Sequence, residues 1–199
     1  DDDEYVLPRP YSILEVENGR MDLLVKVAGR GSAALARTAV GETVRVFAPL
    51  GNGFDLADFH GRPTVLVAGG VGIVPLHRLS RELARAGQQR RPIFGARTPV
   101  DLPLDLLGDE PAGPWDLWVE HGPNEGQREG LVTAGLEEAL ETTPDAVVAT
   151  CGPTPMMHAV ARICRDRGAP LWVCLEEQMG CGAGVCRACV IEDAGSDRM

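Results

Sequence analysis

This sequence of 199 residues lacks three features that would place it in large classes of protein. No unbroken apolar run approaches the about eighteen residues that a membrane-spanning helix needs. No basic segment opens the chain, which begins Asp1-Asp-Asp-Glu4, so a secretory leader is not indicated. Lysine and arginine are scarce, and a net charge of −10 leaves no excess of cations for nucleic acid phosphates. We therefore expect neither a membrane nor a nucleic acid partner.

The cysteines also lack the pattern of a disulfide framework. There are six of them, and Cys151 and Cys164 lie far apart in the sequence. Reduced thiols are typical of the cytoplasm, where we expect the protein to be located. Histidines 60, 77, 121 and 158 are scattered without the spacing of metal ligands, and no Ser-His-Asp or paired-carboxylate arrangement indicates hydrolysis. We therefore assign no catalytic side chain.

Three cysteines near the end of the chain follow a recognisable spacing. Cys181, Cys186 and Cys189 form a C-x4-C-x2-C pattern, which plant-type ferredoxins use to hold a 2Fe–2S cluster with four thiolates. Glycines 180, 182 and 184 let the backbone wrap closely round such a cluster. Cys174 lies in an apolar run and is interpreted as a core residue, so we expect the fourth ligand beyond Met199.

Two other chemistries use a C-x2-C pair. It can be half of a zinc site, but zinc needs a second pair nearby, and the sequence has none. It can be a thioredoxin-like redox pair, but that leaves Cys181 and the gap of small residues unexplained. A non-enzymatic α/β scaffold ending in zinc remains as an alternative.

The front of the chain has the pattern of short strands. Strands are expected at 9–14, 21–27 and 43–48, and a short helix at 32–39. Asn18-Gly19 is a strong hairpin signal between the first two strands. This segment predicts a β-barrel or β-meander.

From residue 62 the pattern changes to apolar strands that alternate with amphipathic helices. Strands are expected at 64–68, 91–96, 116–120, 146–150 and 171–175, and helices at 75–86, 133–142 and 155–167. Such alternation predicts a parallel sheet with helices on both faces.

Two loops of this sheet are candidates for binding a dinucleotide. Gly69, Gly70 and Gly72 join a buried strand to a helix, where the backbone can approach a pyrophosphate at the helix N-terminus. Cys151-Gly152-Pro153 leaves another strand end. Cys151 either fills a strand end or lies against a nicotinamide ring, where a compact polarisable group permits close approach.

The front segment holds candidates for anion binding. The sequence Arg9-Pro10-Tyr11-Ser12 places a guanidinium, which can bind phosphate bidentately, close to an aromatic ring and a hydroxyl. A second possible anion site is Gly29-Arg-Gly-Ser32.

Together these motifs resemble the ferredoxin–NADP reductase superfamily, in which an R-x-Y-S motif binds flavin. Phe94-Gly-Ala-Arg97 matches a common signature of its second strand. Leu175-Glu-Glu-Gln-Met179, followed by the three cysteines, is similar to the electron-transfer subunits of NAD-dependent dihydroorotate dehydrogenases. The resemblance runs from Arg9 through Val190.

The resemblance implies three cofactors and their residues. FAD would contact Arg9, Pro10, Tyr11 and Ser12, with Lys26, Gly31 and Ser32 near its phosphates. NAD would contact Gly69, Gly70, Gly72, Cys151, Gly152 and Pro153, with Asp101 a candidate for the ribose. A 2Fe–2S cluster would be held by Cys181, Cys186 and Cys189.

The expected fold is mixed, with three parts. An incomplete FAD-binding β-barrel (1–57) precedes an α/β parallel-sheet NAD-binding domain (58–173) and a small cysteine-rich cluster lobe (174–199). The resemblance implies an electron-transfer subunit whose partner is the catalytic subunit that oxidises dihydroorotate in pyrimidine biosynthesis. The alternative is the flavin and iron–sulfur subunit of a sulfhydrogenase, a sulfite reductase or an NADH-dependent ferredoxin:NADP reductase.

Overall fold

The computed structural model describes residues 8–103 and 114–191 of the chain. The chain divides into two compact units. Unit 1 combines Asp1–Ser12, Val25–Asn52 and Glu176–Met199, and unit 2 combines Ile13–Leu24 and Gly53–Leu175. Each unit is therefore built from segments far apart in the sequence. The assignment of flavin, NAD and cluster domains to 1–57, 58–173 and 174–199 stays a prediction.

A parallel sheet forms the centre of unit 2. Its strands are β3 (Thr64–Gly69), β4 (Arg90–Ala96), β5 (Asp116–Val119), β6 (Arg128–Glu129), β7 (Val147–Cys151) and β8 (Leu171–Val173). They lie in the order β6-β5-β4-β3-β7-β8, and each neighbouring pair is parallel. Every residue of β3 is buried, as expected for a central strand covered on both faces. The predicted parallel sheet is confirmed.

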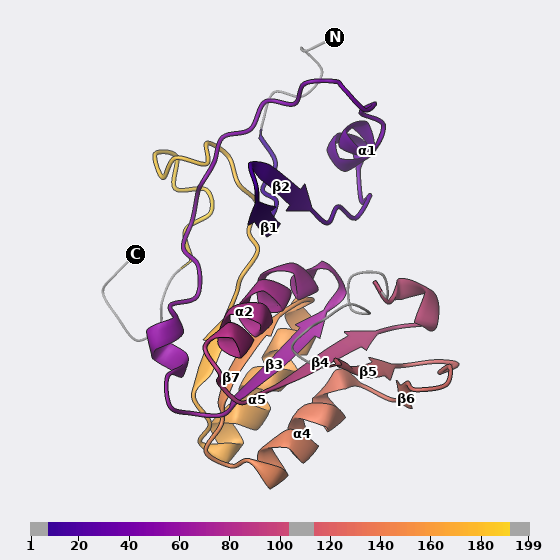
Figure 1. Cartoon of the computed structure of the whole chain (residues 1–199), viewed down its shortest axis with the longest axis vertical. Coiled ribbons are helices and arrows are strands. Elements are labelled where there is room, and N and C mark those ends of the chain that lie inside the picture. Colours follow the sequence, from indigo (N-terminus) through magenta and orange to yellow (C-terminus); the bar gives the residue numbers. More distant parts are fainter. Residues whose placement is uncertain (1–7, 104–113, 192–199) are drawn as a thin grey trace. The chain divides into compact units, whose positions relative to one another are not determined.

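Helices cover both faces of this sheet (Figure 1). Helix α2 (Ile73–Arg85) packs on one face, and α4 (Val132–Thr142) and α5 (Thr154–Arg167) pack on the other. Short 3-10 helices occur at Leu56–Phe59, Gly70–Gly72 and Pro99–Asp101. Within the described ranges, no helix has the length and apolar character needed to cross a bilayer. The three main helices begin and end close to the predicted residues.

The order of the strands creates a switch point beside β3. The chain passes from β3 to β4 on one side, and later returns to place β7 on the other side of β3. At such a point the connections leave the sheet in opposite directions, and a crevice opens at the carboxyl ends of the two strands. The two loops predicted to bind a dinucleotide follow β3 and β7. The topology therefore brings both loops to this edge.

A hairpin of β1 (Ile13–Glu17) and β2 (Arg20–Leu23) also belongs to unit 2. Its turn residues Asn18 and Gly19 have φ values of 50° and 75°, the left-handed conformation that a tight hairpin turn of this type requires. The hairpin packs against α2. The Asn-Gly signal is thus confirmed.

Unit 1 has less regular structure than the sequence predicted. Residues 8–12, 25–52 and 176–191 contain one helix, α1 (Arg30–Ala36), and no strand. The expected strand at 43–48 is wrong: this described segment forms no strand, and Val44, Val46 and Phe47 are exposed. Alternating apolar residues form a strand only where a partner strand satisfies their backbone. The fold is mixed as expected, but the only strands among the described residues of the front segment are the two of the hairpin.

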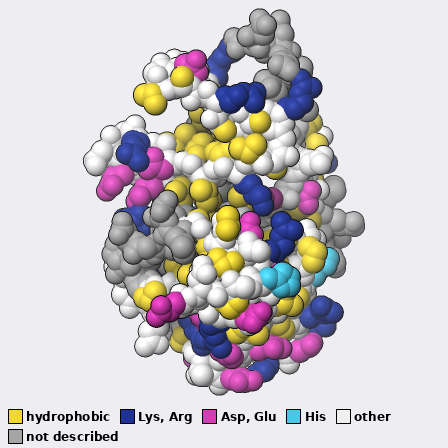
Figure 2. All heavy atoms as spheres, turned by 90° about the vertical axis from the view of Figure 1, so that its right-hand side faces the viewer, with side chains coloured by type: hydrophobic (Ala, Val, Ile, Leu, Met, Phe, Trp, Pro, Cys, Tyr) yellow, Lys and Arg dark blue, Asp and Glu magenta, His cyan; other side chains and the backbone are white. Residues whose placement is uncertain are grey.

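An ion network fastens the edge of the sheet. Arg128 on β6 forms two hydrogen bonds with Glu138 of α4, at 2.7 and 2.6 Å. Its guanidinium also lies 4.0 Å from the ring centroid of Trp118 on β5. Basic and acidic side chains are intermixed over the lower part of the face seen in Figure 2. Because β6 has only two residues, these contacts add to its pairing with β5 in holding it in place.

We expect Arg128→Ala to lower the thermal midpoint by about 2–4 °C near neutral pH, since it removes a stacking contact and a bidentate ion pair. The hydrogen bond from Arg128 holds the pKa of Glu138 below its usual value. A carboxyl whose pKa is depressed by folding stabilises the fold above its unfolded pKa, and this contribution is lost as the pH falls. The difference between wild type and variant should therefore shrink in acid. An equal difference at every pH, measured by thermal denaturation, would contradict the ion-pair explanation.

Candidate functional site

The two predicted nucleotide loops are in direct contact in unit 2. Gly72, at the start of α2, lies so close to the backbone carbonyl of Cys151 that a Cβ at position 72 would overlap it. The same Cβ would lie 2.7 Å from the amide nitrogen of Gly152. The φ of Gly72 is −61°, so this position requires glycine for space and not for conformation. The loops after β3 and β7 therefore form one continuous surface of backbone.

Further contacts close the base of this surface. A Cβ at Gly69 would lie 2.7 Å from Met156 Sδ and 3.0 Å from Pro153 Cδ. A Cβ at Gly152 would lie 2.6 Å from Met156 Cε and 3.0 Å from the amide nitrogen of Gly69. Met156 was not among the predicted site residues, although it lies in the first turn of α5, directly after the second loop. Only the three-dimensional contact shows that this flexible side chain packs between the glycines.

The first loop has the backbone geometry of an anion-binding turn. Gly70 has a φ of 55°, in the left-handed region, and the turn leads directly into α2. Amide groups in the first turn of a helix have no partner within that helix and attract anions such as a pyrophosphate. The residues present therefore fit a dinucleotide at the switch point.

The side chain of Cys151 lies in the core and does not line an open crevice. Its side chain is 1% exposed and belongs to the core cluster on the α2 face. The preceding Thr150 is also buried and donates a hydrogen bond to the carbonyl of Val67, at 2.9 Å. This environment favours the packing interpretation of the Cys151 side chain. Its backbone, however, forms part of the loop surface.

Unit 1 brings together three of the residues predicted to contact a flavin nucleotide. The guanidinium of Arg9 lies against Gly31, where a Cβ would overlap it. The hydroxyl of Ser32 accepts hydrogen bonds from the amides of Ala28 and Gly29, at 3.0 and 3.1 Å. A cation, a glycine and a hydroxyl thus lie within one small region. This set fits a phosphate-bearing ligand.

The other residues predicted for the flavin are positioned less definitely. Pro10 and Lys26 are exposed, and Tyr11 and Ser12 are half-buried. All four lie in unit 1. Their roles rest on the sequence motif alone.

The cysteine loop holds one sulfur in a polarised environment. Cys181 Sγ accepts hydrogen bonds from the amides of Cys186 and Ala183, each at 3.4 Å. These bonds lower the pKa of Cys181 to about 6, and the bond from the amide of Cys186 has the larger effect. Gly180 packs nearby, where a Cβ would lie 3.0 Å from Cys186 Sγ. The loop thus stabilises a thiolate, which is the form of cysteine that binds iron.

Among the described residues, the three predicted cluster ligands do not form a complete metal site. Within the described ranges, no three His, Cys, Asp or Glu side chains lie close enough together to hold a metal ion. Cys181 and Cys186 are brought together by the hydrogen bond from the amide of Cys186 to the sulfur of Cys181. The donor chemistry fits an iron–sulfur cluster, because thiolates directed by backbone amides are its usual ligands.

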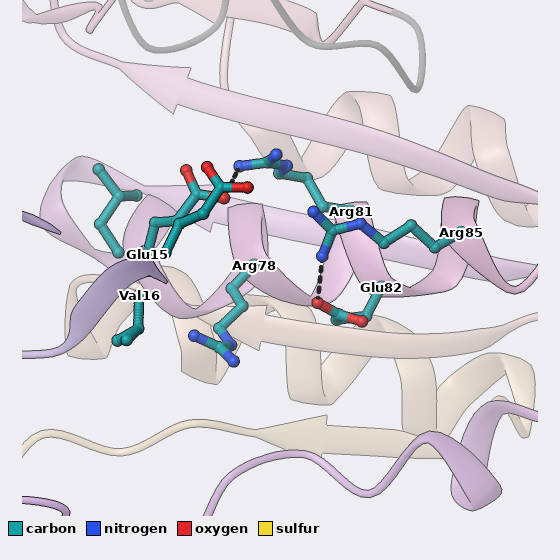
Figure 3. A pocket seen from close by; sticks show the side chains of 8 residues that line it. Glu15, Val16, Arg78, Arg81, Glu82 and Arg85 are labelled. Atoms are coloured by element: carbon teal, nitrogen blue, oxygen red, sulfur yellow. Dashed lines mark hydrogen bonds and ion pairs between the residues drawn. The ribbon is translucent and has the colours of Figure 1, made fainter. Parts of the chain in front are cut away.

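A separate groove of about 170 Å³ lies between β1 and α2 in unit 2 (Figure 3). Its charged side chains are Glu15, Glu17, Arg78, Arg81, Glu82 and Arg85. Arg81 forms an ion pair with Glu15, and Arg85 with Glu82 at 2.7 Å. None of the predicted site residues lines this groove. The Arg81–Glu15 pair joins α2 to β1 and helps to fasten the hairpin, whereas the Arg85–Glu82 pair lies within α2.

The reactivity of Cys164 tests whether α5 packs against the sheet. It is 1% exposed on α5, and burial raises its pKa to about 11. Near about pH 8 only about one molecule in a thousand would carry the reactive thiolate. We expect Cys164 in the native protein to resist iodoacetamide, while the exposed Cys186 of cluster-depleted protein reacts. Peptide mass spectrometry measures both, and equal labelling would contradict the packing of α5.

Curated proteins with similar sequences share one description. The chain is 35% identical over 196 residues to the dihydroorotate dehydrogenase B (NAD(+)), electron transfer subunit, of Bacillus caldolyticus. It is 34% identical over 197 residues to the subunit of the same name from Geobacillus kaustophilus strain HTA426. In both cases the match covers 96% of this chain and 73% of the relative. No family model matches the chain.

Two solved structures with a similar fold are an oxidoreductase and a domain of a dioxygenase. The NADH-dependent reduced ferredoxin-NADP oxidoreductase superposes with a TM-score of 0.78 and 28% identity, covering 91% of this chain and 65% of that chain. The FAD/NAD binding domain of a nitric oxide dioxygenase from Vibrio cholerae superposes with a TM-score of 0.66. Its 22% identity, over 83% of this chain and 76% of that chain, indicates likeness of fold alone.

Proposed function

The chain belongs to the family of dihydroorotate dehydrogenase B electron transfer subunits, and from this premise we propose that it carries electrons between NAD(H) and a partner subunit. The cofactors of this path are FAD and a 2Fe–2S cluster. The nicotinamide exchanges a hydride, the cluster exchanges single electrons, and a flavin can do both. The protein supplies binding sites and orientation.

The observation that carries this proposal is the contact between the loops after β3 and β7. Gly72 and the backbone of Cys151 and Gly152 meet at the switch point of a parallel sheet. Ligands of such sheets bind at this place, and a glycine turn followed by a helix is suited to a pyrophosphate. We assign Gly69, Gly70, Gly72, Cys151, Gly152 and Pro153 to NAD.

The remaining assignments follow the chemistry of the side chains. In unit 1 the cation of Arg9 and the hydroxyl of Ser32 would hold the FAD phosphates, with Lys26 and Gly31, while Pro10, Tyr11 and Ser12 would flank the flavin. Cys181, Cys186 and Cys189 would hold iron, together with a fourth ligand. The amides directed at Cys181 would stabilise the negative charge of its sulfur.

The proposed partner is the dihydroorotate dehydrogenase catalytic subunit, in pyrimidine biosynthesis. Its support is that the curated relatives are electron transfer subunits of dihydroorotate dehydrogenase B. A cytoplasmic location is proposed on the chemistry of the cysteines. All six lie among the described residues as thiols, and thiol ligands suit a reducing compartment.

A second candidate is supported by the structural likeness to the NADH-dependent reduced ferredoxin-NADP oxidoreductase. A subunit of that kind would use the same sites and differ in its partner. The curated relatives favour the first candidate, because their sequence identity to this chain is higher and the match spans a larger share of their length.

Reconstitution with the partner tests the proposal. The full-length protein and a dihydroorotate dehydrogenase catalytic subunit from the same organism are expected to copurify, and together to reduce NAD+ with dihydroorotate. The catalytic subunit alone should not use NAD+. If the complex forms and oxidises dihydroorotate with artificial acceptors, but never with NAD+, the proposed function is wrong. Replacing dihydroorotate by reduced ferredoxin tests the second candidate with the same preparation.

A further inference from the structure

Cys151 and Cys174 lie at equivalent positions of two adjacent parallel strands. Thr150 of β7 lies opposite Val173 of β8. Cys151 is the last residue of β7, and Cys174 directly follows β8. The amide of Cys174 donates a hydrogen bond to the carbonyl of Thr150, at 2.9 Å. The pairing therefore continues to the two cysteines.

Both cysteines also lie on the same face of the sheet. Cys151 belongs to the core cluster on the α2 side, and Cys174 packs against that cluster. Neighbouring strands are about 4.8 Å apart, and disulfides join residues whose Cα atoms are about 4.4–6.8 Å apart. The two thiols are therefore within reach of a disulfide bond without rearrangement of the sheet. Cys164 belongs to the cluster on the opposite face and has no such neighbour.

We propose that Cys151 and Cys174 form a thiol–disulfide switch that weakens NAD binding when it is oxidised. This inference rests on the proposed function, because it assumes that the loop containing Cys151 binds NAD. It adds a regulatory modification at that site, separate from the cysteines proposed to hold the cluster.

The oxidant is hydrogen peroxide or an equivalent two-electron oxidant. Cys174 is half-buried and Cys151 is buried, so the sulfur of Cys174 meets the oxidant first. That sulfur breaks the O–O bond and becomes a sulfenic acid, and one water is released. The sulfur of Cys151 then attacks it, the S–S bond forms, and a second water leaves. Two thiols and one peroxide thus give one disulfide and two waters, and a small dithiol reverses the change.

The consequence for binding follows from the close packing of the loops. The backbone of Cys151 is in contact with Gly72, and the α-carbon of Gly152 packs against the backbone of Gly69. The bond leaves the pairing of β7 and β8 intact, but it turns the Cys151 side chain toward β8 and so shifts the backbone where the loop leaves the end of β7. Since there is no space for a Cβ at Gly72, a small shift changes the turn that faces the pyrophosphate. We expect NADH to bind about tenfold more weakly, equivalent to about 1.4 kcal/mol.

The test treats the full-length protein with hydrogen peroxide, blocks remaining thiols and maps the peptides. Cleavage after Arg162, Arg165 and Arg167 places Cys151, Cys164 and Cys174 on three different peptides. Cleavage after Glu176 and Glu177 separates Cys174 from the cluster cysteines, so a bridge between Cys151 and Cys174 can be distinguished from all others. NADH affinity is measured by fluorescence before oxidation, after oxidation, and after dithiothreitol. Cys174→Ser removes one thiol of the pair, and Cys164→Ser serves as the matched control.

The inference predicts a Cys151–Cys174 peptide and a reversible loss of NADH affinity in wild type and Cys164→Ser. Cys174→Ser should keep its affinity under the same treatment. Absence of the linked peptide, or a linked peptide with unchanged affinity, would overturn the inference. If the reduced protein binds NADH but no bridge forms, only the switch fails. If the reduced protein does not bind NADH, the proposed function fails and the switch fails with it.

Discussion

Gly72→Ala is expected to raise the dissociation constant of NADH about a hundredfold, since small displacements of a binding group have effects of about this size. The added Cβ would overlap the carbonyl of Cys151 and lie close to Gly152. Backbone strain does not contribute, because the φ of Gly72 is −61° and alanine adopts it readily. The loops must therefore separate, and the surface proposed to bind the pyrophosphate is lost.

The matched control for this prediction is Gly53→Ala. Gly53 also lies in unit 2, and a Cβ there meets nothing within 4 Å. Fluorescence titration with NADH should show wild-type affinity for this variant. Thermal denaturation of both variants separates a local effect from general loss of the fold, since overpacking costs about 1–3 kcal/mol of stability. Wild-type affinity in Gly72→Ala would exclude these loops as the NAD site.

Replacement of the tail cysteines is expected to have the second large effect. In Cys181→Ser, Cys186→Ser and Cys189→Ser, the iron content should fall from about two atoms per chain toward zero. A serine hydroxyl keeps the size of the side chain but is a poorer ligand for iron than a thiolate. Cys181→Ser should be the most severe, because its sulfur accepts two backbone amides.

Iron and acid-labile sulfide are measured in each variant beside its flavin content. Cys164→Ser is the control, since that thiol is buried in unit 2 and should not affect iron. Each serine variant should still reduce its flavin with NADH, because the NAD loops are unchanged. Full iron content in all three variants would show that these cysteines do not hold the cluster.

The parallel sheet was predictable because its strands are continuous apolar runs separated by helices with one apolar face. The strand at Thr64–Gly69 is buried on both sides, so no polar residue interrupts the signal. Strand β6 was not predicted, since two residues carry no periodicity. The strand at 43–48 was predicted wrongly, because its alternating pattern does not reveal whether a partner strand is present.

The candidate site was predictable only as separate motifs. The glycines after β3 and the Cys151 loop each had a signal, but their contact depends on the order of the strands. The burial of Cys151 and its position beside Cys174 depend on the register of β7 and β8, which the sequence does not encode locally. The approach of Arg9 to Gly31 likewise joins residues far apart in the chain.

An electron path from NAD through flavin to the cysteine loop can be followed by electron paramagnetic resonance of the full-length, anaerobically purified protein. NADH alone is expected to produce the signal of a reduced 2Fe–2S cluster, and protein depleted of flavin should give this signal with dithionite but not with NADH. A cluster that dithionite reduces but NADH never reduces, in protein with its flavin bound, would contradict an electron path between NAD and the cysteine loop.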